Sequence, residues 1–193
     1  ELFEQFAEPI MRMDSLDAVR IIDNKDGKYI FDFGQNFAGW TKLSIKGEKG
    51  QKIVLRHVEV LDSNYNINPN TTGVTATKVI QTARFICKGG ELEVWEPRFT
   101  YFGFRFVEVE GLKVTPSKDL LKGIVVYSSV PQTGYFSCSE ENINKLHQLA
   151  TWTIKSNIHS IPTDCPHREK CGWTGDAHAL AQVLMYNYNA QKF

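Results

Sequence analysis

The sequence predicts a mainly β chain, an antiparallel β-sandwich followed by the opening helices of a larger helical domain. Between Ala18 and Tyr127, short hydrophobic runs alternate with polar residues and are separated by glycine-bearing turns, a pattern typical of half-buried strands. From Ser139 onwards, hydrophobic residues recur at the spacing of helices instead. This change predicts a β-sandwich domain over residues 1–128 and a helical part over residues 129–193.

The first part contains a series of predicted strands. In order along the chain they cover residues 18–22, 28–33, 40–47, 52–60, 77–87, 102–111 and 123–128. Turn signals such as NKDGK, KGEKGQ and CKGGE lie between them. Many short strands with no helix between them indicate a β-sandwich. The polar segment 62–73, which is rich in asparagine and contains a proline, is predicted as a long loop.

Two helices are predicted in the second part. The first runs from Glu140 to Lys155, with Ser137 or Ser139 placed to cap it and glutamates in its first turn. The second covers residues 175–190. Two helices and one loop do not close a core of useful size. We therefore expect the chain to hold a complete β domain and only the opening piece of a helical domain.

Composition excludes several classes of partner. The 193 residues carry 22 basic and 22 acidic side chains, so no net charge attracts nucleic acid or an anionic membrane surface. No apolar run is long enough to span a bilayer, and a neutral small molecule such as a sugar fits better. The first ten residues lack the pattern of a secretory signal, and four cysteines are too few for a dense disulfide framework. Compartment (cytoplasm, periplasm or outside the cell) and oligomeric state both stay open.

The run PTDCPHREKCGWTGDAH, residues 162–178, is the candidate site. It places Asp164, Arg168, Glu169, Trp173 and Asp176 on one loop bounded by prolines and glycines. Carboxylates and a guanidinium grip sugar hydroxyls through charge-assisted hydrogen bonds, and an aromatic face suits the apolar side of a pyranose. A carboxyl group among other carboxylates in a partly desolvated pocket also stays protonated more easily. Glu169 is the candidate for that proton donor.

Other interpretations of the same run remain open. In a purely structural one, Asp164 caps a helix, Arg168 pairs with Glu169 or Asp176, and Trp173 fills a core. A zinc site would use Cys165, His167, Cys171 and His178, although this spacing matches no usual zinc pattern. A nucleophilic pair would join Cys165 to His159 or His167, with no orienting partner in view. We expect neither a metal nor another cofactor.

The same residues closely resemble a known family. IPTDCPHREKCGWTGDAHA resembles the signature of the bacterial α-L-rhamnosidases of glycoside hydrolase family 78. FDFGQNFAGW, RHVEVLD and PRFTYFGFRFVEVEG are similar to the β-sandwich domain that precedes the helical barrel in that family. TGYFSCSEENINKLHQLATWTIKSNIHSIPTD is similar to the start of the (α/α)6 barrel itself. The resemblance covers nearly the whole chain and implies that the barrel is truncated.

The resemblance also implies a function and roles for residues. Asp164, Arg168, Trp173 and Asp176 would hold the terminal rhamnose of a glycoside or polysaccharide, and Glu169 would protonate the leaving oxygen. Family members invert the anomeric centre, which requires a second carboxylate roughly 6.5–9.5 Å from the acid. That base comes from far later in the family's barrel. We therefore expect an inactive fragment of an inverting hydrolase that releases terminal α-L-rhamnose from rhamnosides.

Some positions depart from the family pattern. Some members carry two adjacent acidic residues at the position of Glu169, where this chain has one. His167 and His178 stand where glutamine is usual, and Cys171 stands where leucine is usual. These differences affect fine geometry rather than the reaction class. We further expect the loop 163–176 to be poorly ordered, because the helices that support it in the family are not part of this chain.

A function of a different class is also open, a non-catalytic carbohydrate-binding β-sandwich module. Its stacking platform would consist of Trp40, Trp95, Tyr101 and Phe102. Aromatic residues in a sandwich are more often buried in the core. At least two exposed, coplanar rings would favour the module.

Overall fold

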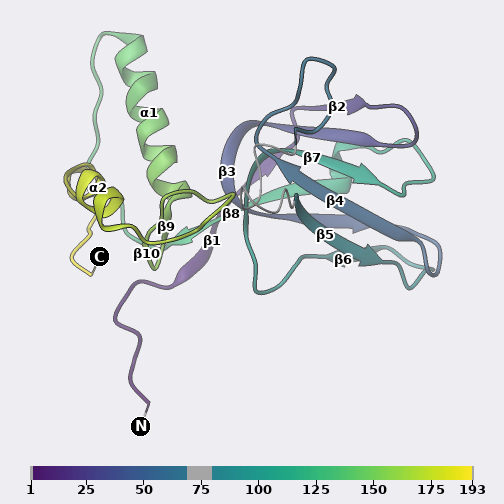
Figure 1. The fold of residues 1–193 in the computed structure, drawn as a ribbon, viewed down its shortest axis with the longest axis horizontal. Coiled ribbons are helices and arrows are strands. Elements are labelled where there is room, and N and C mark those ends of the chain that lie inside the picture. The colour runs from purple at the N-terminus through teal and green to yellow at the C-terminus, as the bar shows by residue number, and fades with distance from the viewer. Residues whose placement is uncertain (1, 69–79, 193) are drawn as a thin grey trace.

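The computed structural model of the chain describes residues 2–68 and 80–192, and it is mainly β (Figure 1). The sheet strands are β1 (Ile10–Asp17), β2 (Arg20–Asp23), β3 (Tyr29–Ile45), β4 (Lys52–Val58), β5 (Gln81–Ile86), β6 (Glu93–Trp95), β7 (Phe102–Glu110) and β8 (Leu121–Ser128), with a short 3-10 helix η2 (Lys118–Leu120) before β8. The second part comprises α1 (Glu141–Ser156), β9 (Ile158–His159), β10 (Ile161–Pro162) and α2 (Thr174–Asn187).

The first eight strands form one antiparallel sheet. Its main order is β1-β8-β3-β7-β4-β5, and β2 and β6 pair with β3 as well. β3 is 17 residues long, and its pairing with β7 shifts register between Asp32 and Phe37. Before the shift β3 pairs with β2, and after it with β8 and β6. The predicted antiparallel β fold is confirmed, with the difference that its strands belong to one curled sheet.

The curled sheet encloses an aromatic core. Phe37 and Phe104 are fully buried with ring centroids 4.4 Å apart, and Phe33 meets both rings edge-on. The same cluster of buried residues continues beyond the sheet. It includes Ile154 of α1, Ile158 of β9, Leu184 of α2 and Tyr188. One continuous core therefore supports both the strands and the helices.

Several strand boundaries differ from the prediction. β1 was not predicted, because this strand is exposed along almost its whole length and has no hydrophobic alternation. β6 is only three residues long and was also missed. The strand predicted over 77–87 begins at Gln81, with residues 77–79 outside the described part. Of the predicted loop 62–73, residues 69–73 also lie outside it, and Asp62 Oδ1 accepts the amides of Asn64 and Asn66.

Both helices form where they were predicted. α1 covers Glu141–Ser156 against a predicted Glu140–Lys155, and α2 ends at Asn187, three residues early. The expected serine cap is wrong, since Glu140 is the N-cap of α1 and its side chain accepts the amide of Asn142. Within 2–68 and 80–192, no helix has the length and apolar character needed to cross a bilayer. The division into domains at residue 128 stays a prediction.

Candidate functional site

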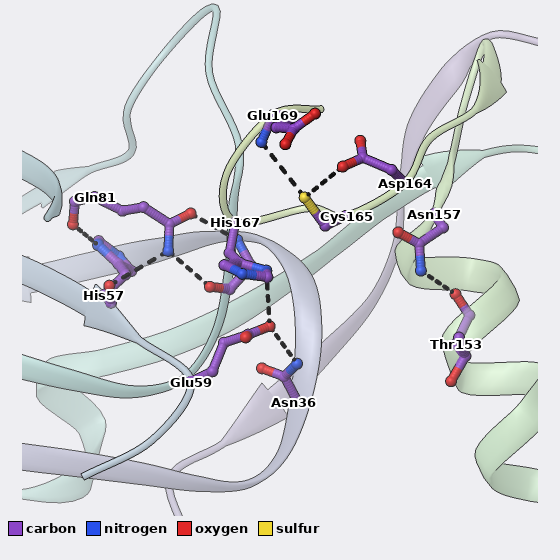
Figure 2. A network of polar contacts seen from close by, with 11 residues as sticks. Asn36, His57, Glu59, Gln81, Thr153, Asn157, Asp164, Cys165, His167 and Glu169 are labelled. Carbon is purple, nitrogen blue, oxygen red and sulfur yellow. Dashed lines mark hydrogen bonds and ion pairs between the residues drawn. The ribbon is translucent and has the colours of Figure 1, made fainter. Parts of the chain in front are cut away.

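The candidate motif forms a closed loop after β10. The amide of Asp164 donates to Cys171 O at 3.0 Å, and the amide of Cys171 donates to Asp164 Oδ1 at 2.9 Å. Cys165 Sγ lies 3.0 Å from Asp164 Oδ2 and accepts the amide of Glu169 at 3.4 Å (Figure 2). These contacts close the loop on itself, and the poor order expected from the sequence stays a prediction.

Asp164 is held as a carboxylate. Burial alone raises the pKa of its carboxyl group, but the hydrogen bonds from Cys165 and Cys171 outweigh burial and bring the pKa below its usual value. An ionised carboxylate accepts hydrogen bonds and cannot donate a proton. Asp164 is therefore suited to accept a hydrogen bond from a sugar hydroxyl, as we predicted, and is not suited to act as the general acid.

Lys170 fixes the loop to the sheet. Its Nζ donates to Tyr101 O at 2.5 Å and lies 4.4 Å from the centroid of the Tyr101 ring. The other partner of that ring is His159 of β9, with centroids 4.1 Å apart and an interplanar angle of 8°. Burial lowers the pKa of Lys170 and that of His159, the latter to about 4, and raises that of Tyr101 to about 12. Through this stack, Lys170, the neighbour of Glu169, is held against Tyr101, which directly precedes β7.

A glycine lets the loop approach the sheet. A Cβ on Gly103, in β7, would lie 2.6 Å from Pro166 Cγ and 3.0 Å from the amide nitrogen of His167. Gln81 holds the backbone of Gly103 from the other side, donating to its carbonyl at 2.8 Å and accepting its amide at 2.9 Å. The motif therefore rests directly on the backbone of the sheet.

The remaining predicted residues lie on the exposed side of the motif. Trp173 is 54% exposed and its Nε1 lies 3.3 Å from Glu169 Oε2. Asp176, in the first turn of α2, lines a cavity of about 360 Å³ together with Asp164. Arg168 is exposed, and within the described residues it pairs with none of the other four. The described residues leave Glu169 exposed, so they do not provide the desolvation that we expected around a general acid.

The structure contradicts the simpler interpretations of this run. Asp164 caps no helix, Arg168 forms no ion pair with Glu169 or Asp176 within the described residues, and Trp173 does not fill a core. Among the described side chains, no three His, Cys, Asp or Glu residues are placed together to hold a metal ion. His159 Nε2 lies 2.9 Å from Val126 O and its ring faces Tyr101, while His167 Nδ1 lies 3.3 Å from Glu59 Oε1. Cys165 Sγ is hydrogen-bonded to Asp164, so within the described residues it pairs with neither histidine.

The four predicted platform residues do not form one surface. Phe102 is buried and stacks on His57 with centroids 4.4 Å apart, and Tyr101 stacks on His159. Trp95 packs against Phe85 at 5.3 Å, and Trp40 Nε1 donates to Glu96 at 2.7 Å. Trp40 and Trp95 line one cavity of about 910 Å³, whereas Tyr101 and Phe102 stack on histidines, so the four aromatics do not form the single platform that the binding-module alternative requires.

A second, larger cavity lies beside the motif. Its volume is about 700 Å³, and residues from the bend of β3, the end of β4, the helix α1 and the motif loop line it. Thr153, Asn157 and Asp164 line both cavities. Sequence reasoning missed the contribution of the sheet and of α1 to this region. The only signal was the segment GQN at 34–36, which interrupts the alternation of the strand.

The fold and this loop define a class, a curled antiparallel β domain followed by two helices with a loop of sugar-binding residue types between them. The family model described as the bacterial alpha-L-rhamnosidase concanavalin-like domain matches residues 22–127, and the model of the bacterial alpha-L-rhamnosidase 6 hairpin glycosidase domain matches residues 131–193. The chain belongs to the bacterial α-L-rhamnosidase family.

Individual relatives agree with this assignment. An alpha-L-rhamnosidase of Formosa agariphila is 42% identical over 95% of the chain, and one of Streptomyces avermitilis is 36% identical over 100% of it. The crystal structure of the Streptomyces avermitilis enzyme complexed with L-rhamnose superposes with a TM-score of 0.91 at 35% identity, covering 97% of this chain and 18% of that one. The chain spans 19% and 18% of the lengths of the two curated relatives.

Proposed function

We propose that the protein containing this chain is an inverting α-L-rhamnosidase that releases terminal α-L-rhamnose from rhamnosides. The observation that carries the proposal is the placement of four motif residues next to one another. Asp164 and Asp176 line one cavity, and Glu169 meets Trp173 beside them. The substrate is a rhamnose-containing glycoside or polysaccharide, and its rhamnose would contact Asp164, Arg168, Trp173 and Asp176.

Glu169 is the general acid in this proposal. As the bond between the anomeric carbon and the leaving oxygen breaks, the proton of the Glu169 carboxyl group passes to that oxygen. A water molecule attacks the anomeric carbon from the opposite face and gives its proton to a second carboxylate, which inverts the configuration. We place that base outside these 193 residues, because the resembling family supplies it from later in the barrel. For the same reason the isolated chain is expected to be inactive.

The test is the Glu169→Gln variant of the protein at its natural length. An amide keeps the size and hydrogen bonding of the side chain but delivers no proton. Hydrolysis of a rhamnoside with a poor leaving group should fall by about 10²–10⁴ in kcat, with little change in binding. An activated aryl rhamnoside should lose much less, since its leaving group needs less protonation.

Asp164→Asn is the matched control. As a ligand of the sugar, Asp164 should affect both substrates similarly and mainly through KM. Full activity of Glu169→Gln on the poor leaving group, or turnover by the isolated 193-residue chain, would contradict these assignments.

A further inference from the structure

The cavity of about 700 Å³ lies between the sheet and the candidate site. Its walls come from the bend of β3, the two residues that follow β4, Arg105 of β7, the carboxyl-terminal half of α1 and the start of the motif loop. Figure 2 shows Asn36, Glu59 and His167 on one side of this region, Thr153 and Asn157 on the other, and Asp164 between them. Its size falls in the range of sites for small ligands.

Several buried polar atoms of the cavity have no partner. Gln35 Nε2, Asn157 Oδ1 and His167 Nδ1 are buried without a hydrogen bond, and all three residues line the cavity. His167 Nδ1 lies 3.3 Å from Glu59 Oε1, but without the alignment of a hydrogen bond. Buried polar atoms are nearly always satisfied by protein, water or a ligand. Three such atoms in one cavity indicate a polar occupant.

The chemistry of the walls selects among occupants. Gln35 offers a donor and Asn157 an acceptor, and a hydroxyl group satisfies both because it donates and accepts. Arg105 also lines the cavity, but Asp32 neutralises its guanidinium through two hydrogen bonds. The carboxylates of Glu59 and Asp164 therefore disfavour an anion. An apolar group would leave the amides unpaired, whereas Leu149, Trp152 and Pro166 suit the apolar faces of a sugar ring. The described side chains also form no metal site here.

The position of the cavity indicates which sugar unit of the substrate would occupy it. Thr153, Asn157 and Asp164 line both this cavity and the smaller one that contains Asp176, so the two cavities adjoin and one ligand can extend across both. We propose that the larger cavity binds the sugar unit to which the terminal rhamnose is attached. This inference rests on the proposed function for the identity of the first sugar. It makes the β domain, through Gln35 and Glu59, a determinant of substrate specificity.

The experiment compares two substrates with similar leaving groups in the protein at its natural length. Methyl α-L-rhamnoside lacks a second sugar, whereas a methyl rhamnosyl-glucoside has one. Gln35→Leu and the milder Glu59→Gln should each lower the ratio of kcat/KM for the disaccharide to that for the monosaccharide by about tenfold. Gln5→Leu is the matched control, since Gln5 is exposed in the amino-terminal segment and the ratio should not change.

A binding measurement separates this inference from the proposed function. In the Glu169→Gln background, titration calorimetry should show the rhamnosyl-glucoside binding more tightly than methyl rhamnoside, and Gln35→Leu should abolish the difference. If the protein hydrolyses neither substrate but the difference in Kd is present, the sugar site stands and the function fails. If hydrolysis is observed but neither variant changes the ratio or the difference in Kd, the cavity holds only water or another part of the protein, and the inference is overturned.

Discussion

Two buried histidines show how single residues support the site. His57 is completely buried beneath Phe102, with Nε2 3.1 Å from Thr41 Oγ1, and burial lowers its pKa to about 3. His159 stacks on Tyr101, and its pKa is lowered to about 4. The two rings pack against consecutive residues, Tyr101 and Phe102. Both histidines are therefore neutral parts of the support beneath the motif.

This neutrality predicts a pH-dependent stability. Below about pH 6.5 the unfolded chain binds protons on His57 and His159, while the folded chain binds none until the pH approaches 4 and 3. The free energy of unfolding should fall as the pH drops from about 6.5 to 4, by up to about 1.4 kcal/mol per pH unit for each histidine. Urea unfolding at several pH values measures the slope. His57→Gln should make it shallower, and an unchanged slope would refute the role of His57.

At the residue scale, the sequence identified the candidate site residues that lie close together in the chain. Asp164, Glu169, Trp173 and Asp176 lie within one short run, so residue types and order sufficed to single them out. Gln35 lies in β3 and Glu59 directly follows β4, both more than a hundred residues earlier. Only the curl of the sheet brings them to the motif, and no local pattern encodes that contact. Within residues 2–68 and 80–192, Arg168 pairs with none of the other motif residues, and the sequence could not show this because the pairing of a guanidinium depends on the final geometry.

At the element scale, the motif loop packs directly against strand β7. Gly103 has no side chain at the point where Pro166 reaches the strand. Gly103→Ala should displace the loop and lower kcat/KM on α-L-rhamnosides by about tenfold or more, since small misplacements of catalytic groups are costly. Steady-state kinetics tests this.

Gly123→Ala provides the control for Gly103→Ala. A Cβ on Gly123 would meet the Phe37 ring at 2.7 Å, within the sheet and away from the loop. This variant should lose stability but retain kcat/KM in the folded fraction. Equal losses of kcat/KM in both variants would mean that Gly103 acts only through general stability.

The elements themselves were predicted unevenly. Strands with one buried face, such as β4 and β7, show a clear hydrophobic pattern and were found. β1 was not, because it pairs with β8 at the edge of the sheet while its own side chains stay exposed. The cap of α1 was also wrong, since several polar residues precede the helix and only the backbone geometry decides which one caps it.

At the scale of the whole molecule, the Tyr101 ring connects the sheet to the motif. It lies between Lys170 and His159, so Tyr101→Leu should release the loop from both. We expect hydrogen exchange at the amides of Asp164 and Cys171 to accelerate by about tenfold, because the bonds that close the loop then open locally. Exchange within α1 should change little.

Phe85→Leu is the matched control for this measurement. Phe85 also loses a ring contact, with Trp95, but it lies in β5 and does not touch the loop. Its variant should leave the exchange of Asp164 and Cys171 unchanged. Unaltered exchange in Tyr101→Leu would show that other contacts hold the loop.

The continuous core has a consequence for the engineering of chimeras. Ile154, Ile158, Leu184 and Tyr188 pack in the same cluster as the sheet, although they follow β8 in the chain. A graft joined at residue 128 would therefore place foreign side chains against these four and against the loop on Gly103. Exchange of the β domain between homologues should succeed only when both halves of this interface are transferred together.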